Sequence, residues 1–80
     1  MARKETYDRV AKVTARVLNV APADIKPESN FVFDLGAEST QSVELVAAFE
    51  GEFNVEMDEE SALGVKTVGD AVDFIAGYVK

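Results

Sequence analysis

The sequence predicts an all-α domain: a small four-helix bundle with three longer helices, one short third helix and a long loop between helices one and two. Three observations favour this fold class. Apolar residues recur at helical spacing in three segments, both prolines lie in one connection, and 80 residues fit a single domain spanning 1–80. Such a short chain buries only about 60% of its unfolded surface, so we expect modest stability.

The first predicted helix runs from about residue 5 to 18. At 100° per residue, one side is apolar, and Asp8, Arg9, Lys12 and Arg16 fall on the other. The apolar side is formed by Tyr7, Val10, Ala11, Val13, Val17 and Leu18. Asn19 follows the last turn and suits a left-handed stop.

A long connection follows, from Asn19 to Glu38, and Pro22 and Pro27 prevent it from being helical. Twenty residues is long for a compact domain, and loops of this length are usually functional or disordered. We expect this one to be pinned to the core by its apolar residues, Ile25, Phe31, Phe33 and Leu35. Gly36 suits a tight turn just before the next helix.

The second predicted helix spans about Ser39 to Phe53. Glu50 interrupts its broad apolar arc, for a reason that the sequence does not provide. The arc consists of Val43, Leu45, Val46, Ala47, Phe49 and Phe53. Residues 55–57 fit a short extended link, and residues 58–63 fit a helix of one turn at most.

The last predicted helix is the most clearly patterned. Thr67 and Asp70 match a capping box at its start. A single apolar face follows, formed by Val68, Ala71, Val72, Phe74, Ile75, Tyr78 and Val79.

Composition argues against several classes of function. The chain has no cysteine and no histidine, so it lacks thiolate ligands, the commonest metal ligand and the usual general base. We therefore expect no enzyme and no metal site. The net charge of −7 argues against nucleic acid as a partner. No apolar run approaches the length of a membrane span, and we expect a cytoplasmic monomer without stable membrane association.

The charge is unevenly distributed. Residues 27–65 contain ten acidic side chains and no Lys or Arg, whereas residues 1–26 contain six basic and three acidic ones. Such an acidic block is commonly the solvated face of a helical bundle. It is also typical of a docking surface for basic partners, where charge speeds and orients encounter.

The segment Asp34–Thr40 is the candidate for chemistry. A serine at a helix start is ordinarily an N-cap, and Ser39 could be no more than that. However, Ser39 ends a long anchored loop and follows an acid, and it projects above an apolar arc containing Val46, Phe49 and Phe53. A helix N-terminus also favours an anion, so a phosphodiester on Ser39 would be well placed.

At this segment the chain resembles the acyl carrier protein family. The stretch Phe31-Val32-Phe33-Asp34-Leu35-Gly36-Ala37-Glu38-Ser39, continuing into Val43-Glu44-Leu45-Val46, is similar to that family's attachment site. The similarity extends through residues 49–53, 55–60, 67–68 and 71–75. The first helix matches by pattern rather than identity, so the resemblance covers nearly the whole chain.

This resemblance implies a cofactor and a set of partners. Holo-acyl-carrier-protein synthase would transfer 4′-phosphopantetheine from coenzyme A to Ser39, and the arm's thiol would carry acyl groups as thioesters. Acyl-processing enzymes would dock basic patches against the second helix and its surroundings, at Glu38, Thr40, Glu44, Glu52, Glu59 and Glu60. The acyl chain would lie among Val43, Val46, Phe49, Met57, Val65, Val68, Ala71 and Val72.

The sequence departs from the family's pattern near the attachment site. Glu38-Ser39-Thr40 replaces the usual Asp-Ser-Leu, Phe33 replaces an acid, and Leu63-Gly64 replaces a polar stretch. Drift in a small domain would explain these changes. We hypothesise instead a specialised carrier with a dedicated partner, because Phe33 and Leu63 add apolar surface beside the docking face.

Two alternatives remain open from the sequence. The chain could be a peptidyl, aminoacyl or polyketide carrier domain. It could also be an unmodified acidic adaptor whose apolar groove binds a partner helix, with Ser39 only a cap.

Overall fold

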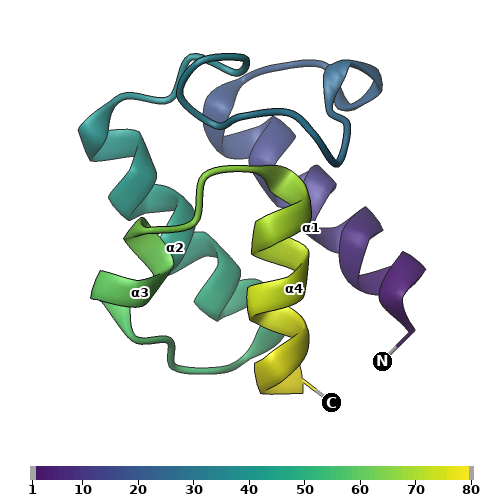
Figure 1. The fold of residues 1–80 in the computed structure, drawn as a ribbon, viewed down its shortest axis with the longest axis vertical. Coiled ribbons are helices and arrows are strands. Elements are labelled where there is room, and N and C mark those ends of the chain that lie inside the picture. The colour runs from purple at the N-terminus through teal and green to yellow at the C-terminus, as the bar shows by residue number, and fades with distance from the viewer. Residues whose placement is uncertain (1, 80) are drawn as a thin grey trace.

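The computed structural model describes residues 2–79, which form four α-helices and one short 3-10 helix (Figure 1). The helices are α1 (Arg3–Leu18), α2 (Ser39–Phe53), α3 (Glu59–Leu63) and α4 (Val68–Val79), and η1 (Pro22–Asp24) lies in the connection after α1. Helix α1 packs against both α2 and α4, and the short α3 lies beside α2. The predicted fold class is confirmed.

Helix α1 supplies the centre of the core. Its apolar side buries Val10 and Val13 completely, in a cluster with Phe49 of α2 and Ile75 of α4. The helix begins two residues earlier than the sequence predicted, because the Thr6 N–H donates to the carbonyl of Ala2 at 3.0 Å and closes another turn. It ends at the expected stop, since Asn19 adopts the left-handed conformation with φ 56°.

The connection between α1 and α2 is anchored to the core by three of the four apolar side chains expected there, with Leu35 partly buried against the core. Ile25 and Phe31 are buried, and the Phe31 N–H donates to the Lys66 carbonyl at 3.0 Å, beside an isolated β-bridge between Asn30 and Thr67. This bridge fastens the loop to the segment that precedes α4. The connection crosses the upper end of the bundle in Figure 1 and leads directly into α2.

The expectation that Phe33 is pinned to the core is wrong. The side chain is 88% exposed, whereas the neighbouring Phe31 is buried. The cause is a hydrogen-bonded turn over residues 30–36, in which the Asn30 side-chain oxygen accepts the N–H groups of both Val32 and Phe33 at 2.9 Å. Because the turn fixes the backbone, only some of its side chains can face inward. Gly36 closes it with φ 74°, a value that favours glycine.

The structure of α2 explains why an acid, Glu50, interrupts its apolar arc. The Glu50 carboxylate accepts the backbone N–H of Met57 at 2.8 Å, so it ties the extended link after α2 back to the helix. The buried residues of α2 are Leu45, Val46, Phe49 and Phe53. The arc is therefore narrower than predicted, since Val43 is 47% exposed.

Helices α3 and α4 both begin at side-chain caps. Asp58 caps α3 by accepting the backbone N–H of Ser61 at 3.0 Å, and this cap orders the short helix that the pattern of residues 58–63 indicated only weakly. The Thr67 hydroxyl oxygen accepts the Asp70 N–H at 3.1 Å at the start of α4, which is one of the two hydrogen bonds of the predicted capping box. Helix α4 then buries Val68, Ala71, Val72 and Ile75.

Candidate functional site

Ser39 is the first residue of α2 and is not its cap. The N-cap is Glu38, whose backbone N–H donates to the Gln41 side-chain oxygen at 3.0 Å in a reciprocal capping box. The interpretation of Ser39 as an ordinary N-cap serine is therefore wrong. Glu38 can take this role because its carboxylate reaches the backbone N–H of Gln41, the third residue of the helix, while the Gln41 side chain accepts the Glu38 N–H.

The hydroxyl of Ser39 is free to be modified. Ser39 is exposed, and within residues 2–79 its hydroxyl makes no hydrogen bond, whereas the Ser42 hydroxyl one turn later donates to the Glu38 carbonyl at 3.3 Å. The backbone N–H groups of Ser39 and Thr40 belong to the first turn of the helix, where no intrahelical acceptor exists. These groups and the helix dipole suit a phosphate group attached at Ser39.

A cavity of about 280 Å³ lies next to this end of α2, between α2, α3, α4 and the loop at residues 30–33. Ser42, Val46 and Phe49 line it from α2, on the same helical face as Ser39. Ser42 lies only about 4.5 Å along the helix axis from Ser39, by the rise of 1.5 Å per residue. A flexible arm on Ser39 could therefore reach the cavity.

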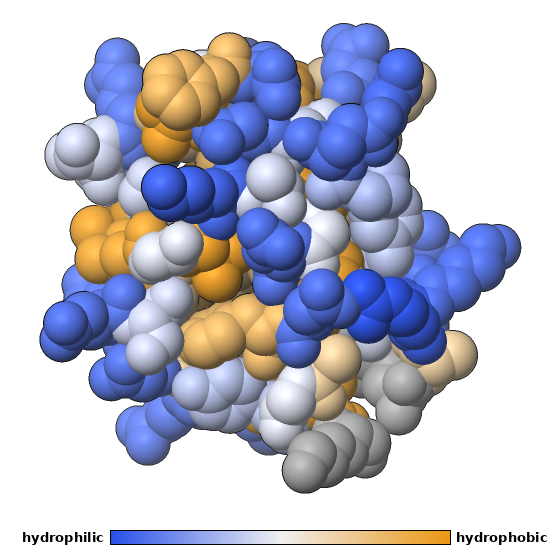
Figure 2. Space-filling view, in the orientation of Figure 1, coloured by the Kyte–Doolittle hydropathy of each residue, from blue (hydrophilic) through white to orange (hydrophobic). Residues whose placement is uncertain are grey.

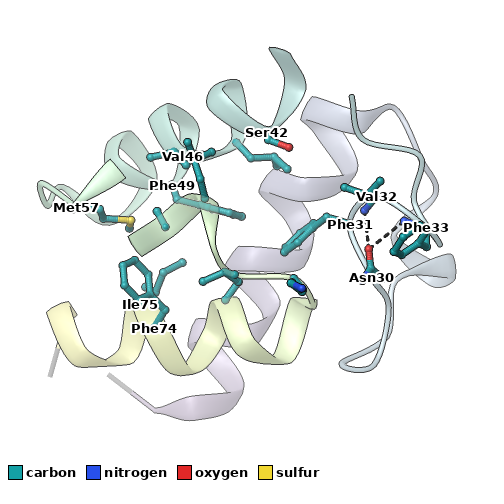
Figure 3. Close-up of a pocket in the computed structure, with 16 residues that line it drawn as sticks. Asn30, Phe31, Val32, Phe33, Ser42, Val46, Phe49, Met57, Phe74 and Ile75 are labelled. Atoms are coloured by element: carbon teal, nitrogen blue, oxygen red, sulfur yellow. Dashed lines mark hydrogen bonds between the residues drawn. The ribbon is translucent and has the colours of Figure 1, made fainter. Parts of the chain in front are cut away.

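The cavity wall is mostly apolar. Its polar residues are Asn30, Ser42 and Lys66, and Met57 and Ile75 lie at the end away from the loop. Figure 3 shows Val32 and Phe33 at the loop end, with Phe31 between them and the end away from the loop. A mostly apolar wall of this kind suits an apolar chain.

The structure places five of the eight predicted acyl-chain residues on the cavity wall: Val46, Phe49, Met57, Val65 and Ala71. The other three lie elsewhere. Val43 is largely exposed, Val68 is fully buried away from the cavity, and Val72 faces a shallow groove beside Tyr7 and Pro27.

Sequence reasoning missed much of the cavity wall. Leu45, Phe74 and Ile75 could have been found, because each belongs to an apolar face that the periodicity had already identified. The others lie in segments with no helical pattern, and only the folded loop and α3 bring them to the cavity. They are Asn30, Phe31, Val32, Phe33, Ala62, Leu63 and Lys66, together with the polar Ser42 of α2.

The predicted docking residues are in different environments. Glu38, Thr40 and Glu44 are exposed on α2 and its cap, and Glu59 and Glu60 are exposed on the first turn of α3. Glu52, in contrast, is only partly exposed and is paired with Arg9. The Arg9 Nε donates to its carboxylate at 2.8 Å, and both side chains are about one-third exposed or less.

Arg9 also lies over the Phe53 ring, with 4.7 Å between the guanidinium carbon and the ring centroid. It donates a further hydrogen bond to the Glu52 carbonyl. Together these contacts join α1 to the last turn of α2, so much of the charge of Glu52 is neutralised within the molecule.

Electrostatics at the start of α3 are set by one carboxylate. Hydrogen bonds from the Ser61 hydroxyl, at 2.6 Å, and from the Ser61 N–H lower the pKa of Asp58. The carboxylate is therefore the favoured form of this cap. Among residues 2–79, no group of acidic side chains is arranged to hold a metal ion, and no helix is long and apolar enough to cross a membrane.

A scan of the sequence against family models gave a match with the phosphopantetheine attachment site family over residues 8–75. The matched range contains Ser39, the whole of α2 and α3, and all residues of the cavity wall. It covers most of the chain, and domains of this family carry 4′-phosphopantetheine as a covalently attached cofactor. The chain belongs to the phosphopantetheine attachment family and is a carrier protein of the acyl carrier type.

Proposed function

We propose that Ser39 carries the phosphopantetheine arm and that the protein shuttles acyl groups, as thioesters, between enzymes of fatty-acid, lipid or related acyl metabolism. We further propose that it works in the cytoplasm, where thiols remain reduced, and that it contributes no catalysis of its own. The observation that supports this most directly is the free hydroxyl of Ser39 on the first residue of α2, within the family match.

Attachment would proceed through the Ser39 oxygen. The partner transferase supplies the catalytic base and the metal, so the hydroxyl needs only to be accessible and unbonded. A new bond would form from this oxygen to the phosphorus of coenzyme A's phosphopantetheine, and the nucleotide portion of coenzyme A would leave. The exposed Ser39 and the unpaired N–H groups of the first turn suit this product.

When bound, the arm supplies a thiol that holds the cargo as a thioester. The protein's own residues would then shelter and present that cargo. Ser42, on the cavity wall, lies one turn from Ser39, and the apolar part of the wall includes Phe49, Met57 and Ile75. A volume of about 280 Å³ is close to the lower end of the range for small-ligand pockets, so an acyl chain of limited length fits best.

Docking of partner enzymes would use the exposed acids around α2 and α3. Glu38, Glu44, Glu59 and Glu60 are the best candidates, because their carboxylates face solvent. Glu52 is a weaker candidate, since Arg9 already pairs with it. Partners with basic patches would be steered to this surface, and the effect should diminish as salt increases.

The proposal is tested by incubating the apo-protein with coenzyme A, Mg²⁺ and a promiscuous phosphopantetheinyl transferase, followed by intact mass measurement. Wild type should gain one phosphopantetheine group and Ser39→Ala should gain none. Ser42→Ala is the matched control, because this serine lies on the same face one turn later and should still leave the protein modifiable. Modification of Ser39→Ala, or its loss in Ser42→Ala alone, would contradict the assignment.

The family match favours a carrier over the unmodified adaptor, and it leaves the class of cargo open. A peptidyl, aminoacyl or polyketide carrier domain is the second candidate. The largely apolar cavity favours a simple acyl chain over an aminoacyl group, whose charged amine would find no carboxylate on the cavity wall. The mass of the thioester on natively purified protein decides between them.

A further inference from the structure

Three of the large apolar side chains on the surface gather at the mouth of one cavity. Val32, Phe33 and Leu63 are 52%, 88% and 44% exposed, and all three line the cavity beside α2. We call these three residues the apolar rim. Single exposed apolar residues are ordinary, but a cluster at the entrance of a cavity is typical of an interaction site. Figure 2 shows apolar surface interrupting the polar surface at the loop and over α2 and α3.

Hydrogen bonds to the backbone hold the loop part of the rim, Val32 and Phe33, in place. The Asn30 side-chain oxygen accepts the N–H groups of Val32 and Phe33 (Figure 3). The Asp34 carboxylate accepts the Asn30 N–H at 2.7 Å. The Gly36 N–H donates to the Val32 carbonyl at 3.1 Å. An exposed aromatic on such a turn loses little backbone entropy on binding, as is favourable for the anchor of an interface.

The rim is formed by two segments of the chain that the fold brings together. Val32 and Phe33 come from the loop before α2, and Leu63 is the last residue of α3. The β-bridge between Asn30 and Thr67 fastens the loop to the segment that leaves α3. A partner that covers the rim would therefore contact both segments and would also cover the entrance of the cavity.

The surroundings of the rim select the partner's charge. Residues 27–65, which include all three rim residues, contain ten acidic side chains and no basic one. Lys66, the next residue, is the single basic residue on the cavity wall among residues 2–79. A second copy of this chain would bring the same acidic block against itself, so self-association is disfavoured. A surface with apolar residues surrounded by Lys and Arg complements both features.

We propose that the apolar rim is a docking surface for a partner protein that presents an apolar patch within a basic surround, with Phe33 as the anchor. This inference rests on the proposed carrier function only for the partner's purpose, which is to receive or load the cargo at the cavity mouth. The contact itself needs no arm, so it should persist when Ser39 is replaced. The rim thus supplies a specificity determinant separate from the acids of α2.

The test places a photo-crosslinking phenylalanine at position 33, 63 or 43 of the full chain in its native cells, and maps each crosslinked peptide by mass spectrometry. Val43 is the matched control, because it is 47% exposed on α2 but does not line the cavity. Positions 33 and 63 should label one partner, at apolar residues flanked by Lys and Arg, and position 43 should label that patch much less. The purified partner is then used for binding measurements.

Phe33→Ser should weaken binding of that partner about 10- to 30-fold, as expected for an aromatic anchor, and Leu63→Ser should weaken it less. Val43→Ser and Ser39→Ala should leave the affinity within about twofold, since neither residue belongs to the rim. Absence of a crosslink at 33, a crosslink to a second copy or to an acidic patch, or equal effects of Phe33→Ser and Val43→Ser would overturn the inference. Retained binding by Ser39→Ala separates this result from failure of the proposed carrier function.

Discussion

At the scale of single residues, the candidate attachment site is formed by neighbours with different roles. Glu38 caps α2, Ser42 donates to the Glu38 carbonyl, and the hydroxyl of Ser39 is left without a partner among residues 2–79. A serine that capped the helix would lose that bond on esterification, and the helix would be weakened. Because Glu38 supplies the cap, modification of Ser39 should cost the helix little.

Two buried threonines of α1 give a residue-scale prediction for stability. The Thr14 hydroxyl is fully buried and makes no hydrogen bond within the described part of the chain, whereas the Thr6 hydroxyl donates to the Ala2 carbonyl at 3.1 Å. Thr14→Val should raise the free energy of unfolding by about 1 kcal/mol, because an unsatisfied polar group is removed without a change of shape. Urea denaturation monitored by circular dichroism measures this change.

Thr6→Val is the matched control for that experiment. It removes a hydroxyl that does have a partner, so it should lower the free energy of unfolding by about 0.5–1.5 kcal/mol. If both variants moved stability in the same direction, the difference between the two hydroxyls would be refuted.

At the scale of elements, α3 is the part whose order depends most on a single cap. It has only five residues, none of them buried, and Asp58 accepts both the N–H and the hydroxyl of Ser61. Helix α3 also supplies Ala62 and Leu63 to the cavity wall. Loss of this cap should therefore loosen one side of the cavity while leaving α1, α2 and α4 packed.

The pH dependence of this cap has a defined sign. Because its bonds with Ser61 lower the pKa of Asp58 in the folded state, the cap stabilises α3 fully above the ordinary aspartate value of about 3.9. Its contribution is lost as the pH falls through the lower folded-state value. The amide chemical shift of Ser61, followed by NMR, should titrate with a midpoint below about 3.9.

Ser61→Ala supplies the control, since it removes the hydroxyl bond that contributes most to lowering the pKa of Asp58. In this variant the midpoint, followed at the amide of residue 61, should shift upward toward the ordinary aspartate value. A wild-type midpoint at or above the ordinary value, or no difference between the two proteins, would contradict this description of the cap.

At the scale of the whole molecule, most of the fold was predictable because three helices have strong apolar periodicity and the stop at Asn19 and the start at Thr67 are local signals. Helix α2 was predicted from Ser39 to Phe53, and the structure has the same bounds. The cap at Asp58 and the bond from Met57 to Glu50 were not foreseen. Both depend on side chains meeting across a turn, which periodicity does not describe.

The candidate site was predictable in part, for a related reason. The position of Ser39 and five cavity residues followed from the helical face and the family resemblance. The outward direction of Phe33 could not be predicted in this way, because the hydrogen bond to the Asn30 side chain within the turn sets it. The ion pair between Arg9 and Glu52 likewise joins two different helices. From the sequence alone, these residues could be described only as two separate exposed charges.

The charge distribution and the site are parts of one arrangement. The basic segment at residues 1–26 lies mostly in α1, while the acidic block includes α2, α3 and Ser39. The surface around Ser39 therefore faces approaching partners with negative charge and an apolar entrance. Such an uneven charge distribution orients a basic partner before any close contact is made.

The central claim is that the oxygen of Ser39 bears the phosphate-linked arm, and the most direct test is the site of modification on protein purified from its native source. Cleavage after glutamate releases the peptide Ser39–Glu44, which contains Ser39, Thr40 and Ser42. Fragmentation mass spectrometry of this peptide should place a phosphopantetheine group on Ser39. An unmodified peptide, or a group on Thr40 or Ser42 instead, would contradict the claim.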